Sequence, residues 1–62
     1  MSWQELVQKE LMQARQELAA AEEGLKDGTP AAHNRYVRAL HEAEIAEHRA
    51  ENASRRSWRQ EA

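Results

Sequence analysis

The stretch Asp27-Gly28-Thr29-Pro30 is the one credible break in this 62-residue chain, and it decides the fold. Glycine and proline interrupt helices most strongly, and the whole chain holds only two glycines and one proline. Gly28 suits the left-handed residue that ends a helix. Thr29 can cap a following helix, with Pro30 in its first position. The sequence therefore predicts a turn at residues 27–29 between two helices.

The two helices are predicted over about residues 3–26 and 30–58, followed by a frayed carboxyl end. The start of the first helix, Ser2-Trp3-Gln4-Glu5, fits a capping box, in which serine and glutamate satisfy free backbone donors. Good helix formers fill both segments, and β-branched residues are few. We therefore predict an all-α fold, with residues 1–62 forming one domain built as an antiparallel two-helix hairpin.

Apolar residues recur in both segments at the intervals of three and four that are typical of a coiled-coil seam. In the first segment the seam comprises Trp3, Val7, Leu11, Ala14, Leu18, Ala21 and Leu25. In the second segment it comprises Ala32, Tyr36, Ala39, Ala43, Ala46, Ala50 and Ala53. Folding the chain back at the turn pairs large residues with alanines, namely Leu18 with Ala39, Leu11 with Ala46, Val7 with Ala50 and Trp3 with Ala53. We therefore expect the two helices to approach closely.

A single hairpin of this size buries too little apolar surface to offset the entropy lost on folding. Val37 and Leu40 lie just outside the alanine seam, which makes them candidates for contact with a second copy. Two hairpins related by a twofold axis would form a four-helix bundle, so we predict a homodimer. In architecture alone, this plan is similar to the Rop-type hairpin dimers that bind paired RNA loops. The competing interpretation is a monomeric hairpin that becomes ordered only on a partner.

The composition argues against several classes of protein. Nine basic and eleven acidic residues give a net charge of −2, which disfavours a protein built mainly to bind nucleic acid. The chain has no cysteine, which excludes a disulfide framework and a thiolate zinc site. The longest apolar run, residues 19–21, is far too short to span a membrane, and no signal-peptide core follows Met1. We therefore expect a soluble, cytoplasmic protein.

Chemistry at a metal or catalytic site is not expected. His41, Glu44 and His48 lie along one side of the second helix and offer ligand types suited to zinc or iron. This side lies nearly opposite the alanine seam, so we favour solvated polar residues and predict no metal and no cofactor. The sequence shows neither a nucleophile at a recognisable spacing from a base nor a glycine-rich phosphate loop. We therefore predict that the protein is not an enzyme.

The segment from Ser54 to Arg59 combines three arginines with a tryptophan. Such a composition can contact phosphate and stack on a base, so RNA or DNA binding is the first alternative function. The acidic first helix would oppose a polyanion, and positive charge at a helix carboxyl end also favours the helix dipole. A tryptophan among arginines is equally typical of a protein interface.

The predicted function is non-catalytic binding of a partner protein, by an adaptor, regulator or inhibitor that occupies the partner's surface. Met12 and Ile45 suit a modest protein-binding patch, and Ile45 is interpreted as lying alone among polar residues on the outer side of the second helix. The residues predicted to contact a partner are Val37, Leu40, Ile45, Arg55, Arg56, Trp58 and Arg59. The second alternative is a His/Glu metal-binding module.

Overall fold

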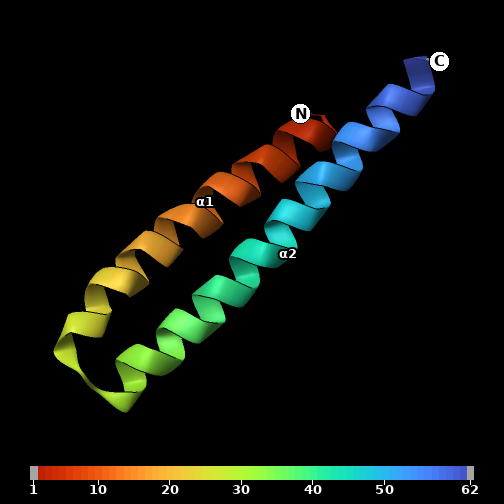
Figure 1. The fold of residues 1–62 in the computed structure, drawn as a ribbon. Helices are drawn as coiled ribbons and strands as arrows, with labels where there is room; N and C mark the ends of the chain where they lie inside the picture. Colours follow the sequence, from red (N-terminus) through yellow and green to blue (C-terminus); the bar gives the residue numbers. More distant parts are fainter. Residues whose placement is uncertain (1, 62) are drawn as a thin grey trace.

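The computed structural model describes the backbone of residues 2–61 and the side chains of residues 2–55. The chain forms two helices, α1 (Trp3–Gly24) and α2 (Pro30–Glu61), joined through a short 3₁₀ helix, η1 (Leu25–Asp27). Between residues 2 and 61 there is no strand. The helices pack against each other in opposite directions, and α2 continues past the start of α1 (Figure 1). The prediction of an all-helical chain with two packed helices is confirmed.

Both helices begin at the side-chain caps that the sequence predicts. The Ser2 hydroxyl accepts a hydrogen bond of 3.2 Å from the backbone N–H of Glu5. The Thr29 hydroxyl accepts one of 3.1 Å from the backbone N–H of Ala32. Each bond satisfies a donor that the first turn of a helix leaves free, so these residues fix where the helices start.

The turn closes around Gly28, which has a φ of 67° and is the one described residue with a positive φ. Its N–H donates a 3.0 Å hydrogen bond to the carbonyl of Leu25. The last turn of the first helix tightens into η1, so α1 ends at Gly24 instead of residue 26. The second helix runs to Glu61, three residues past the expected end at residue 58.

Alanine substitutions at the two glycines should change the free energy of unfolding in opposite directions. Gly24 has helical angles (φ −63°, ψ −22°), and an added Cβ would meet nothing closer than a guanidinium nitrogen of Arg35 at 3.8 Å. We expect Gly24→Ala to raise the free energy of unfolding by about 0.4–1 kcal/mol. Gly28→Ala should lower it by about 1–2 kcal/mol, because a side chain is strained at positive φ. Urea unfolding followed by circular dichroism measures both free energies of unfolding. Changes of the same sign in the two variants would contradict the described conformation of this turn.

The core is a row of alanines on α2 packed against two larger side chains of α1. Val7 and Leu11 are buried, and they form one cluster with three of the α2 alanines. The buried α2 alanines are Ala39, Ala43, Ala46, Ala50 and Ala53. The predicted alanine seam therefore faces α1. Small side chains on one helix allow the two helices to pack closely, while the larger side chains of the facing helix fill the space between them.

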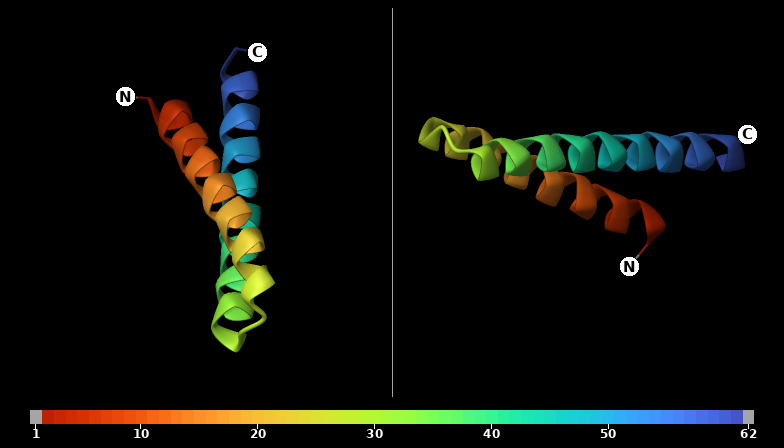
Figure 2. Two further views of the ribbon diagram at one scale, coloured as in Figure 1. Left: turned by 90° about the vertical axis from the view of Figure 1, so that its left-hand side faces the viewer. Right: turned by 90° about the horizontal axis from the view of Figure 1, so that it is seen from below.

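Two residues of the predicted seam remain exposed in the structure, Leu25 (37%) and Trp3 (58%). Trp3 is the larger departure. It lies beside Ala53, Arg49 and Asn52 at the edge of the helix pair. Two successive steps of four residues, from Trp3 to Leu11, drift by roughly 80° around a helix. The neighbouring Gln4 reaches across the seam instead, where its side-chain amide donates a 3.5 Å hydrogen bond to the carbonyl of Ala53. Toward this end the two helices diverge (Figure 2).

Candidate protein-binding surfaces

Large apolar side chains remain exposed on both broad sides of the hairpin, flanking the buried seam. Helical spacing from the seam divides them into two groups. The Met12 face is named for Met12, Val37 and Leu40, whereas Leu25 lies at the turn end of the predicted seam itself. The Ile45 face is named for Trp3, Leu6 and Ile45. All seven side chains are at least 36% exposed.

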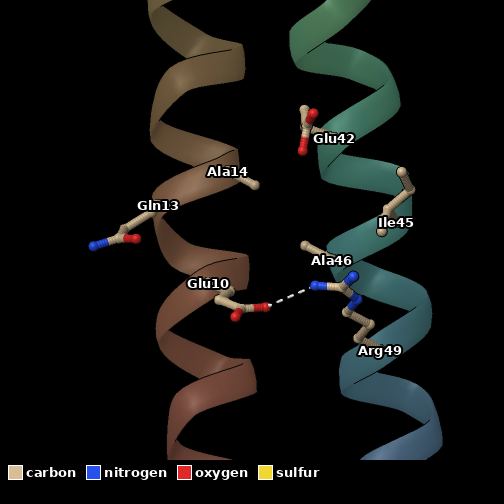
Figure 3. Close-up of a pocket in the computed structure, with 7 residues that line it drawn as sticks. All are labelled: Glu10, Gln13, Ala14, Glu42, Ile45, Ala46 and Arg49. Carbon is tan, nitrogen blue, oxygen red and sulfur yellow. Dashed lines mark hydrogen bonds and ion pairs between the residues drawn. The ribbon is translucent and has the colours of Figure 1, made fainter.

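The Ile45 face contains an open groove between the helices (Figure 3). Its lining from α1 is Glu10, Gln13 and Ala14, and its lining from α2 is Glu42, Ile45, Ala46 and Arg49. The interpretation of Ile45 as isolated on the outer side of α2 is therefore wrong. Ile45 directly precedes a seam alanine, so it is rotated only one residue step away from the contact with α1 and borders the groove.

Charges of both signs line this groove. Arg49 of α2 reaches Glu10 of α1 across 3.4 Å (Figure 3), and Glu42 adds a second carboxylate to the lining. Arg49 also borders the hollow beside Trp3, so the groove continues toward the open end of the hairpin. The resulting surface offers apolar anchors next to oriented charges, an arrangement suited to binding a protein segment.

The Met12 face carries two of the residues predicted to contact a partner, Val37 (50% exposed) and Leu40 (36% exposed). They lie just outside the alanine seam, as their spacing predicts. Beside them, α1 forms a shallow hollow lined by Gln8, Leu11, Met12, Arg15, Gln16 and Ala19. This side therefore combines an apolar centre with an exposed hollow on the neighbouring helix.

Closer to the turn, a bidentate salt bridge links the two helices. The guanidinium of Arg35 donates hydrogen bonds of 2.8 and 2.9 Å to the two carboxylate oxygens of Glu17. These hydrogen bonds, aided by the positive charge, lower the pKa of Glu17 and raise that of Arg35. Both side chains are about half exposed, so the pair contributes little to stability.

The arginine-rich end is described only at its beginning. Arg55 is exposed and contacts Glu51 one turn earlier at 2.7 Å, so its charge is already partly compensated. The side chains of Arg56, Trp58 and Arg59 lie outside the described ones, although α2 includes their backbone. The described contact supports the helix itself, as expected for an i,i+4 pair.

His41, Glu44 and His48 are all exposed on α2. Among the described residues, no three histidine, cysteine, aspartate or glutamate side chains come together in a way that could hold a metal ion. Within the same part of the chain, neither helix has the length and apolar character needed to cross a membrane.

Comparison with known proteins identifies no relative of this chain. No family model matches the chain, and neither a curated protein nor a solved structure is significantly similar to it. Function is therefore inferred from the residues and their geometry.

Proposed function

We propose that this protein is a non-catalytic binding module that forms a homodimer and occupies the surface of a partner protein. The observation that carries the proposal is the imbalance between buried and exposed apolar side chains. Among the described residues, Val7 and Leu11 are the only large apolar side chains that are buried, whereas seven others are exposed. So small a core is typical of chains that gain stability by association.

The homodimer accounts for one of the two apolar faces. Two hairpins packed face to face form a four-helix bundle, in which a second apolar layer joins the alanine seam in the core. The stability of such a dimer increases with chain concentration, because association is linked to folding. A twofold axis leaves the opposite face of each hairpin open.

The open face is the one we assign to the partner protein. On the Ile45 face, Ile45 and Trp3 are apolar anchors at a groove whose rim carries Glu10, Glu42 and Arg49. An amphipathic helix can lay its apolar side into such a groove while its charges meet those at the rim. The rim charges set the orientation of the partner and disfavour wrong partners.

Capture with matched variants tests this function. We expect the parent chain and the His41→Arg control to retain the same protein from a lysate of the source cells. Ile45→Arg should reduce retention at least about tenfold, because a charge in the apolar centre of an interface costs more than about 1.4 kcal/mol. Quantitative mass spectrometry measures the difference, and circular dichroism confirms that both variants keep their helices.

Two results would contradict the proposal. Equal retention by the parent and Ile45→Arg would show that the Ile45 face binds nothing. Retention of nucleic acid that dissociates steeply and log-linearly with salt would favour the arginine-rich end as the binding site instead.

A further inference from the structure

The groove of the Ile45 face carries enough chemistry to specify its occupant. Extending the function proposed above, on which this inference rests, we infer that the bound segment is an amphipathic helix with a carboxylate between two apolar side chains. The apolar side chains pack against Ile45 and Trp3, and the carboxylate binds Arg49. The occupant is thus a segment of a different protein, and Arg49 is the residue that selects it.

Two exposed apolar side chains mark the ends of this binding surface. Ile45 of α2 borders the groove, and Trp3 of α1 borders the hollow that continues it beside Asn52. Asn52 lies seven residues past Ile45, so the two anchors are about 10 Å apart along α2. In a helix that lies along the groove, side chains seven residues apart project from the same face at this separation. One bound helix can therefore reach both anchors.

Arg49 is the residue that the groove and the hollow share. It lies four residues past Ile45 and three residues before Asn52, and therefore about midway between the anchors. One guanidinium nitrogen, Nη1, contacts Glu10 at 3.4 Å (Figure 3), and 58% of the Arg49 side chain remains exposed. The guanidinium has further N–H donors besides those on Nη1, so it can also bind a carboxylate of the partner.

A carboxylate is the group that this position favours. A helix that covers Arg49 removes water from the guanidinium donors. An apolar group there leaves those donors unsatisfied, and a basic group repels the guanidinium, whereas a carboxylate replaces the lost hydrogen bonds. Glu42, the other carboxylate on the α2 side of the groove, lies seven residues before Arg49, on the far side of Ile45. The arginine position therefore stays open to an acidic group.

The spacing of the anchors distinguishes this partner from a second copy of the chain. A helix that reaches both anchors needs two exposed apolar side chains seven residues apart. The exposed large apolar side chains among the described residues are Trp3, Leu6, Met12, Leu25, Val37, Leu40 and Ile45. No two of these are seven residues apart, so this chain does not supply the matching segment.

Two synthetic helical peptides test the charge at Arg49. Each has about 18 residues, long enough for an alanine-rich helix, and carries two leucines seven residues apart. One peptide has glutamate, and the other lysine, at the fourth residue after the first leucine. We expect the glutamate peptide to bind the parent chain at least about tenfold more tightly, because lysine repels the guanidinium that glutamate satisfies. Fluorescence anisotropy of the labelled peptides measures both affinities.

Two charge reversals on α2 provide a matched pair. Arg49→Glu should reverse the preference between the peptides, and Arg49→Gln should abolish it. Arg38→Glu makes the same change in net charge at an exposed residue that does not line the groove, so it should keep the preference within about twofold. Ile45→Arg should weaken the binding of both peptides. Circular dichroism checks that every variant keeps its helices.

The outcomes separate this inference from the proposed function. Reversal in Arg49→Glu, with the preference retained in Arg38→Glu, supports the inference. If Ile45→Arg weakens both peptides but the parent chain binds them equally well, the inference is overturned and the proposed function stands. A preference lost equally in Arg49→Glu and Arg38→Glu also overturns it, because the net charge then decides. If neither peptide binds the parent chain, the inference fails, and capture from the source cells decides the proposed function independently.

Discussion

Replacing Leu11 by alanine is expected to lower the free energy of unfolding by about 2–5 kcal/mol. Leu11 is 8% exposed and belongs to the cluster with Ala46 and Ala50. Those neighbours are too short to move into the space that the lost side chain leaves, so the cavity remains and the loss should be large. Because a chain of this size has only a few kcal/mol of stability, we expect Leu11→Ala to be largely unfolded at 25 °C.

The same substitution at Leu6 serves as the control. Leu6 is 39% exposed and lies on the Ile45 face, away from the seam. We expect Leu6→Ala to cost less than about 1 kcal/mol, close to the range of ordinary surface changes. Helix content by circular dichroism and urea unfolding, both at one chain concentration, compare the two variants. Equal losses at the two positions would contradict the buried position of Leu11.

The sequence is sufficient to predict the turn and the alanine seam because both depend on local chemistry. Gly28 and Thr29 act within one or two residues, and the α2 alanines repeat at intervals of three and four without a break. The same logic fails at Trp3, where two steps of four follow each other. A seam residue can drift out of contact there, and the structure puts Gln4 in its place.

The binding surfaces are harder to predict because they depend on how the two helices are aligned. The spacing of Val37 and Leu40 places them beside the seam from sequence alone. The place of Ile45 cannot be predicted from α2 alone, because the groove that it borders also needs Glu10 and Ala14 of α1.

Replacing Ala46 by leucine is expected to lower the free energy of unfolding by about 1–3 kcal/mol, because the added carbons have no space in the seam. Ala46 is 6% exposed and lies in the cluster with Val7 and Leu11. A leucine there forces α1 away from α2, which also strains the ion pair between Glu10 and Arg49. Alanine and leucine have similar helix propensities, so the loss reports on packing between the helices.

The exposed Ala20 offers the matched control, and we expect Ala20→Leu to change stability by less than about 0.5 kcal/mol. The sharper comparison combines Ala46→Leu with Leu11→Ala, which moves the large side chain from α1 to α2 at the same level of the seam. If the two side chains share one space, the double variant should be more stable than the sum of the single losses predicts. Strictly additive losses in urea unfolding would show that Leu11 and Ala46 do not fill a common space, and would contradict the packing of a leucine knob against an alanine groove.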